Sequence, residues 1–385
     1  MENAINTLRI QNFKSIKDVT IQPRRVNLII GMPNVGKSNI LEAMSLLGGM
    51  FFDDKHDIFM RNQIRYEQIR NIFYDNNWRE DVKIDSNIGF ANIYNSKGYD
   101  GVFVVFGNDV YLKKFSKESV GEVVNSYREQ LESVSGEGSA EERKFVEEYK
   151  NILACFDYYS SDGKKNGDEP SIEEVSVLIK KYKYEKYVEF GREYKFKFLS
   201  PPLGVNLIDT LQSNGIVLRR QISDMFKPYG LDFAMRVVDG IFEVQKNEDG
   251  FITTIPYSLI ADTLQRIIFY LAAIESNDDS VLLFEEPEAH TFPVYTSMLG
   301  RKIVESRNNQ FFVATHSPYL VTEILEQMLP DEEQAGELAI FLAYYEDYQT
   351  KVKQLSDEEV REIRNNSIDV FYNLSRFTPG SNLYA

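Results

Sequence analysis

Short apolar runs bounded by polar residues indicate where the strands of this chain lie. Residues 7–13 and 18–21 alternate apolar and polar side chains, as half-buried strands do. Residues 26–30, 281–284 and 310–314 are apolar enough for buried strands. Segments with helical spacing lie between these runs, so the pattern predicts an α/β fold.

Residues 82–112 predict an antiparallel lobe. Residues 82–84 and 89–94 are expected to be strands, and 101–106 and 109–112 are expected to pair as a hairpin. The first part of the chain therefore adds an antiparallel β lobe to a mixed sheet.

From about residue 116 the apolar positions become sparse and fall at helical spacing. Residues 117–134, 140–157 and 171–190 predict helices rich in Glu and Lys. We interpret 116–200 as a helical arm or lid, inserted into a core made of 1–115 and 201–385. A helical part of the same core is an equally good interpretation.

Composition limits the class of protein. The chain has 385 residues, of which 43% are hydrophobic, enough for a full core and two lobes. Its single cysteine excludes an internal disulfide and fits a reducing, cytoplasmic location. No apolar run is long enough to span a bilayer, and the N-terminus lacks the pattern of a signal peptide. The net charge of −16 argues against coating nucleic acid with the whole surface, but leaves room for a local basic groove.

The most informative stretch is 31–38, which fits G-x-x-x-x-G-K-[ST] between the strand at 26–30 and a helix. Its glycines let successive N–H groups point at phosphate oxygens, and the helix dipole favours the same charge. Lys37 is expected to reach the β- and γ-phosphates, and the Ser38 hydroxyl to ligate Mg²⁺. The predicted nucleotide-binding residues are Gly31, Met32, Pro33, Asn34, Val35, Gly36, Lys37, Ser38 and Asn39.

Two acids follow the buried strand at 281–284. Glu285 is placed to hold Mg²⁺, and Glu286 to polarise the attacking water. His316 follows the strand at 310–314, where it would contact the γ-phosphate or the water. A histidine in such a loop is usually structural, but two of the three histidines in the chain, His290 and His316, follow strands in this way. We therefore favour a catalytic role for Glu286 and His316.

These motifs resemble those of the ABC-type ATPases related to SMC, RecF and the overcoming-lysogenization-defect proteins, including stand-alone ATPases of bacterial anti-phage systems. The resemblance covers residues 5–48 and 255–325. It implies a P-loop NTPase head of ABC type that uses ATP and Mg²⁺. It also implies a homodimer or higher even oligomer, with ATP held between two heads. The family's dimer-contact loop corresponds to 287–291, with Glu288 and His290, and its switch histidine to His316.

The chain departs from the family at two places. The signature motif, which caps the partner's ATP, corresponds to 261–266, where Thr263 replaces the expected glycine. Capping is then expected to be weaker, or to use Asp262 and Arg266. The glutamine that contacts Mg²⁺ in the family has two candidates, Gln63 and Gln68.

Residues 179–197 alternate basic and aromatic side chains, among them Lys180, Lys181 and Lys183. One interpretation is binding of single-stranded nucleic acid by charge and stacking. The interleaved glutamates favour the other, in which the aromatic rings pack inwards and the lysines are solvated.

The function that these observations favour is an ATP-driven switch that controls a separate effector protein in anti-phage defence. The residues after 325 are expected to be too few for the nuclease domain that DNA-cutting OLD-like proteins carry, so any effector is expected to be a separate chain. The alternative is a RecF- or SMC-like ATPase of DNA repair or processing that binds nucleic acid directly. A GTPase is disfavoured because Asn-Lys-x-Asp is not found. A chain that binds nucleotide without hydrolysis would explain the altered signature. No membrane partner is expected.

Overall fold

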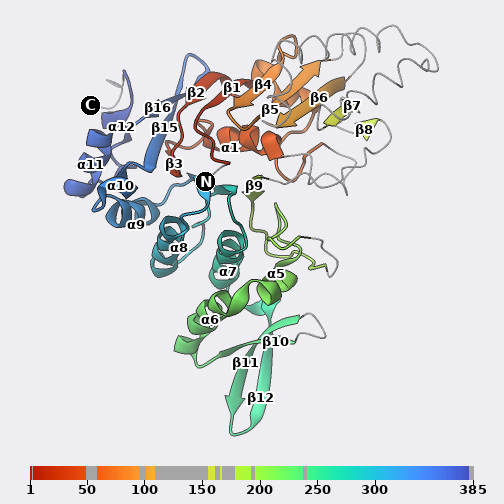
Figure 1. Ribbon diagram of the computed structural model, residues 1–385, viewed down its shortest axis with the longest axis vertical. Coiled ribbons are helices and arrows are strands. Elements are labelled where there is room, and N and C mark those ends of the chain that lie inside the picture. The colour runs from red at the N-terminus through yellow and green to blue at the C-terminus, as the bar shows by residue number, and fades with distance from the viewer. Residues whose placement is uncertain are drawn as a thin grey trace.

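A six-stranded sheet carries residues 31–38 and the strands that precede Glu285 and His316 (Figure 1). The computed structural model describes residues 1, 3–48, 59–95, 101–108, 155–160, 165–166, 178–191, 196–236 and 241–380. Five strands run parallel and the sixth is antiparallel at one edge. Their order is β16 (Gln349–Gln354), β15 (Leu338–Glu346), β3 (Val26–Ile30), β14 (Gln310–Ala314), β13 (Val281–Glu285) and β9 (Ile179–Tyr182).

A second, seven-stranded sheet is wholly antiparallel and confirms the expected β lobe. Its order is β2 (Ile16–Ile21), β1 (Leu8–Phe13), β4 (Val82–Ser86), β5 (Gly89–Asn95), β6 (Gly101–Asn108), β7 (Cys155–Ser160) and β8 (Lys165–Asn166). The predicted strand at 109–112 lies outside the described residues.

Helix α1 (Lys37–Ser45) lies between the two sheets. Its residues Ile40 and Met44 share one core with Ile84 of β4 and with Leu283 of β13. The opposite face of the six-stranded sheet is covered by α7 (Asp262–Glu275), α8 (Pro293–Glu305) and α9 (Pro318–Met328). Each parallel strand is therefore buried on both faces, which explains why β3, β13 and β14 read as continuous apolar runs.

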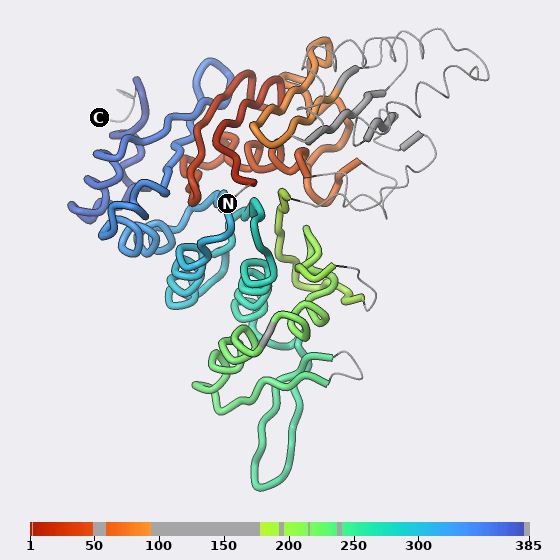
Figure 2. Tube along the Cα trace, in the orientation of Figure 1, coloured from red at the N-terminus to blue at the C-terminus, as the bar shows by residue number. Residues whose placement is uncertain are grey.

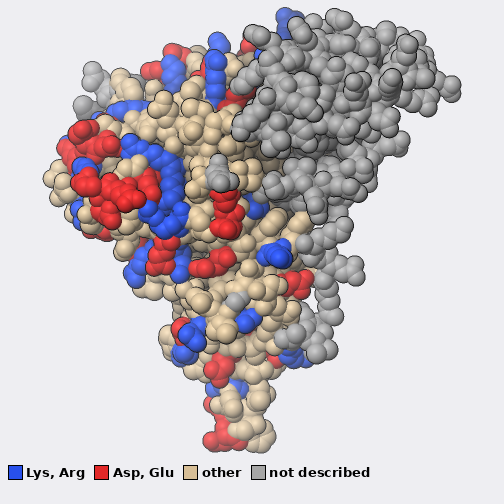
Figure 3. All heavy atoms as spheres, in the orientation of Figure 1, with Lys and Arg blue, Asp and Glu red and all other residues tan. Residues whose placement is uncertain are grey.

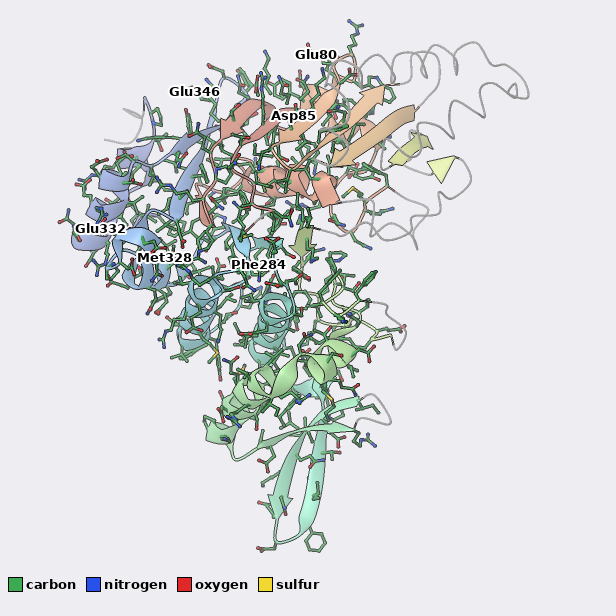
Figure 4. The ribbon with its side chains drawn as sticks, in the orientation of Figure 1. Glu80, Asp85, Phe284, Met328, Glu332 and Glu346 are labelled. Carbon is green, nitrogen blue, oxygen red and sulfur yellow. The ribbon has the colours of Figure 1, made fainter. Side chains whose placement is uncertain are left out.

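Alternation along β13 divides its side chains between the two cores. Val281 and Leu283 face α1, whereas Leu282 and Phe284 face the helices on the other side. Phe284, labelled in Figure 4, packs edge-on against Tyr270 of α7 with ring centroids 4.9 Å apart. The acids that follow β13 are thus held by a rigid, fully packed strand.

A smaller lobe hangs below α7 and is built from residues between β9 and β13 (Figure 2). It comprises α5 (Leu207–Ser213), α6 (Gly215–Phe226) and the three-stranded sheet of β10 (Asp232–Arg236), β11 (Ile241–Glu248) and β12 (Phe251–Pro256). The C-terminal part adds α10 (Glu332–Ala335), α11 (Asp357–Asn365) and α12 (Leu374–Phe377). Short 3₁₀ turns are η2 (Ile69–Ile72), η3 (Tyr74–Asn76), η4 (Lys227–Tyr229) and η5 (Tyr257–Leu259).

The predicted helix over 171–190 is wrong where the structure describes it, because residues 179–182 form β9. Residues 155–157 likewise belong to β7 rather than to a helix. Backbone pairing to β13 and β6 decides these conformations, and it overrides the local helical spacing. The helices predicted over 117–134 and most of 140–157 lie outside the described residues, so the arm stays a prediction there.

The prediction that the lysines of 179–197 are solvated is wrong for Lys180 and Lys181, which are buried in β9. Lys183 is exposed, as predicted, and pairs with Glu185 at 2.7 Å. In the described part of the face in Figure 3, basic and acidic side chains lie beside one another. No helix of the described residues has both the length and the apolar character needed to cross a membrane.

Candidate functional site

The loop between β3 and α1 has the backbone geometry that its two glycines permit. Gly31 has φ 149° and Gly36 has φ 94°. A Cβ on Gly31 would lie 2.3 Å from the carbonyl oxygen of Ala343, and one on Gly36 would lie 2.1 Å from Oγ1 of Thr350. Both positions therefore combine a positive φ with close approach by β15 or β16, and only glycine fits.

Several neighbours fix the shape of this loop. The Thr350 hydroxyl donates to the carbonyl of Val35 at 2.8 Å and lies 2.6 Å from the Ser15 hydroxyl. Asn39 donates to the same Ser15 oxygen at 2.7 Å. The predicted binding residue Asn39 thus supports the loop from behind in this structure.

Lys37 is folded back over the loop. Its Nζ donates to the carbonyls of Gly31 at 3.0 Å and Met32 at 2.8 Å. Burial lowers the pKa of Lys37 to about 8, although the carboxylates of Glu286 and Glu285 oppose the decrease. The ammonium lies where phosphate oxygens would meet the loop, and an anion there would favour its charged form.

Glu285 and Glu286 follow β13 but turn toward different partners. The Ser38 hydroxyl lies close enough to the Glu285 carboxylate to lower its pKa. Glu286 adopts φ 45° and donates its N–H to the carbonyl of Ala314 at 2.8 Å. Its carboxylate Oε1 lies 3.5 Å from Nε2 of His316. The left-handed residue thus directs one acid toward α1 and the other toward the end of β14.

Burial lowers the pKa of His316, the Lys37 ammonium lowers it further, and Glu286 partly opposes both. The imidazole is therefore neutral near pH 7, with one nitrogen able to accept a proton. The predicted pair of Glu286 and His316 is brought together by two neighbouring parallel strands.

Glu288 holds the His316 loop rather than facing outward. Its Oε1 accepts from the Thr315 hydroxyl at 2.5 Å and from the His316 N–H at 3.1 Å, while its Oε2 is buried without a partner. Burial raises its pKa. In this structure its side chain therefore has no free face for the predicted dimer contact, whereas His290 is exposed.

The signature-like residues lie at the start of α7. Thr263 donates its hydroxyl to the His290 carbonyl at 2.9 Å, and Asp262 accepts from the Tyr184 hydroxyl at 3.1 Å. The Arg266 guanidinium lies over the Tyr184 ring, 4.6 Å from its centroid. The loop after the two acids is thus tied to the helix that would carry the signature.

Sequence reasoning missed a group of charged side chains beside Glu285, the acid that is expected to hold Mg²⁺. Arg65 bridges Glu42 of α1 at 2.7 Å and Glu285 at 3.1 Å. Lys181 lies 3.3 Å from Glu285, and Lys14 pairs with the buried Glu42. These residues belong to no motif. The one signal in the sequence was the pair Lys180 and Lys181 between apolar residues, because a lysine that is buried in a strand needs a charged or polar partner.

The two glutamine candidates differ in place. Gln63 is buried, its side-chain Nε2 has no partner, and its backbone carbonyl accepts from Lys181 at 2.9 Å. Gln68 instead caps the η2 turn. Gln63 is therefore the candidate that lies beside the Glu285 group.

The donor set beside the loop fits Mg²⁺. The Ser38 hydroxyl and the Glu285 carboxylate lie beside each other, and hard oxygen ligands of this kind suit the ion. Mg²⁺ usually takes only one or two protein oxygens and completes its shell with water and phosphate. Burial raises the pKa of Glu285, but Lys181, the Ser38 hydroxyl and Arg65 outweigh that effect and keep the carboxyl ionised.

A glycine-bounded phosphate loop, a buried lysine and a strand-end acid pair define a P-loop nucleotide-binding protein. The family model described as "AAA ATPase domain" matches residues 111–321, and the chain belongs to that family. The match includes both acids and His316 but begins after the phosphate loop. The predicted relationship to ATPases of this type is thereby confirmed.

Three solved structures illustrate the similarity to SMC heads. One is an Smc head bound to the C-winged helix domain of ScpA, with 14% identity, TM-score 0.47, and 93% of this chain and 99% of that chain covered. Another, from Pyrococcus furiosus, is an Smc head domain with an extended coiled coil bound to the C-terminal domain of ScpA. It has 14% identity and TM-score 0.44, with 94% of this chain and 99% of that chain covered. The SMC head domain from Thermotoga maritima has 14% identity and TM-score 0.38, with 91% of this chain and 99% of that chain covered. A search of curated protein sequences finds no match.

Proposed function

We propose that this chain hydrolyses ATP with Mg²⁺ and that ATP joins two copies through the face that bears the site. We further propose that the joined state controls a separate effector protein in cytoplasmic anti-phage defence. The observation that carries the proposal is the convergence of Lys37, Ser38, Glu285, Glu286 and His316 at the ends of β3, β13 and β14.

In this proposal the loop N–H groups and Lys37 bind the phosphates of ATP, which replace the carbonyls that Lys37 now contacts. Ser38 and Glu285 hold Mg²⁺, which supplies positive charge against the phosphates. Glu286 accepts a proton from the attacking water and orients it. His316, neutral and 3.5 Å from Glu286, hydrogen-bonds the water or the terminal phosphate.

Exposed apolar side chains around the site support the proposed contact between copies. Met32 lies on the phosphate loop, Phe292 and Val294 follow the His290 loop, and Tyr319 follows His316; all four are exposed. Exposed apolar residues beside a polar site are typical of protein contact surfaces. Control of an effector and the role in defence rest on the sequence resemblance alone.

The test of the switch is the oligomeric state of Glu286→Gln, which should bind ATP without turning it over. Light scattering after size exclusion should give a dimer with ATP and Mg²⁺ and a monomer with ADP. Glu80→Gln is the matched control, because Glu80 is exposed and far from the site (Figure 4). A Glu286→Gln protein that binds ATP but stays monomeric would refute the proposed joining of two copies.

A further inference from the structure

Lys181 places a positive charge against Glu285 from inside the core sheet. It belongs to β9, which pairs in parallel with β13, the strand that ends at Glu285. The Lys181 side chain is 3% exposed, and its Nζ lies 3.3 Å from Oε2 of Glu285. The same Nζ donates to the backbone carbonyl of Gln63 at 2.9 Å. Two partners from separate segments therefore fix the ammonium.

The neighbouring Lys180 is equally buried but serves a different place. Alternation along β9 directs it to the opposite face of the sheet, where its Nζ donates to Asn277 at 2.5 Å and Ser280 at 2.9 Å. It also lies 3.9 Å from the centroid of the Phe198 ring. Lys180 thus stabilises the helical side of the sheet, and Lys181 faces the phosphate loop.

The other cation at Glu285 is held less firmly. The Arg65 side chain is 66% exposed, so it can leave Glu285 for solvent, whereas Lys181 has no such freedom. When phosphates bind at the loop, negative charge gathers beside Glu285, and a cation must offset it. In this chain one such cation is built into the sheet.

We propose that Lys181 is a positioning residue that acts as a permanent counter-charge for Glu285 and so sets how strongly nucleotide binding depends on Mg²⁺. The inference rests on the proposed binding of nucleotide at residues 31–38. Because Lys181 already offsets one negative charge, the wild type retains much of its nucleotide affinity without Mg²⁺. Without Lys181, only the exposed Arg65, Lys37 and the divalent ion offset the charge of Glu285 against the phosphates, so binding depends more strongly on the ion.

The experiment measures the dissociation constant of ADP by calorimetry, once in Mg²⁺ and once in EDTA. ADP is used so that the result does not depend on turnover. The ratio of the two constants should rise about tenfold or more in Lys181→Met, since a close, poorly solvated charge is lost. Lys181→Arg keeps the charge and should return the ratio toward that of the wild type.

Lys180→Met is the matched control, and its ratio should equal that of the wild type. If Lys181→Met does not fold, Lys181→Gln gives the same test with a polar side chain. An unchanged ratio in the neutral Lys181 variants, or an equal rise in Lys180→Met, overturns the inference. A wild type that does not bind ADP under either condition overturns the proposed nucleotide site itself, which is seen before any variant is compared.

Discussion

His316 and Glu286 face each other across the ends of two neighbouring parallel strands, with Nε2 3.5 Å from Oε1. A different feature of the backbone fixes each side chain. Glu286 is turned by its left-handed backbone, and His316 is held by the hydrogen bond from its N–H to buried Glu288. The pair is therefore preorganised by the strands before any substrate binds.

This geometry predicts the effect of removing the imidazole. His316→Ala should lower the turnover of ATP about 100-fold or more, because a group that hydrogen-bonds the water or phosphate is lost. ADP affinity should change little. Since the pKa of His316 is lowered, the wild type should keep its activity at neutral pH and lose it as acid protonates the ring. Steady-state rates against pH, for both proteins, check this; equal turnover in the variant would exclude a role in catalysis.

Lys37 predicts a second pH dependence, at the alkaline end. Its pKa of about 8 belongs to the protein without nucleotide, and phosphates prefer the charged ammonium. Nucleotide affinity should therefore be level below about pH 8 and decrease above it. Lys37→Arg stays protonated and should show no such decrease over the same range. Calorimetric titrations of ADP at several pH values measure both curves. A decrease of the same size in the arginine variant would assign the effect to another group.

Two substitutions of Glu288 should differ in their effect on the free energy of unfolding. Glu288→Gln should change the free energy of unfolding by less than about 1 kcal/mol, because the amide oxygen still accepts both hydrogen bonds and one polar atom was already unpaired. Glu288→Ala should cost about 1–3 kcal/mol, since the Thr315 hydroxyl and the His316 N–H lose their acceptor. Urea unfolding measures both. Equal costs would show that the two hydrogen bonds do not hold the His316 loop.

A side chain at position 36 should abolish ADP binding by steric overlap, and this effect can be separated from backbone strain. Gly36→Ala should abolish ADP binding, because the new Cβ would overlap the Thr350 hydroxyl. Gly250→Ala is the matched control: its φ is 89°, close to the 94° of Gly36, but no atom lies within 4 Å of the added Cβ. Each carries a strain of about 1–3 kcal/mol, yet only Gly36→Ala should lose binding. Retention of ADP binding by Gly36→Ala would contradict the assigned loop geometry.

The sequence predicted the parts of the site that depend on local order. Residues 31–38 and the pair Glu285 and Glu286 each follow one strand, so their chemistry can be read from consecutive residues. The position of His316 beside Glu286 followed from the shared edge of a sheet. These elements are set by short segments, and the structure places them together.

The missed parts depend on pairing between distant segments. Lys181 lies beside Glu285 only because β9 joins the sheet next to β13, and no spacing in the sequence indicates that neighbour. The lysine-rich composition of 179–183 instead suggested a solvated surface, since lysines are rarely buried. Arg65 was missed for the same reason: its partners Glu42 and Glu285 lie on different elements.

In the proposed function, Glu286 activates the water at an ATP-hydrolysing site. The most direct test is steady-state ATP hydrolysis by the wild type, by Glu286→Gln and by the remote control Glu80→Gln. We expect turnover in the wild type and in Glu80→Gln, and a loss of about 100- to 10,000-fold in Glu286→Gln with ADP affinity retained. Equal turnover in Glu286→Gln and the wild type, or nucleotide binding without turnover in all three, would contradict the account.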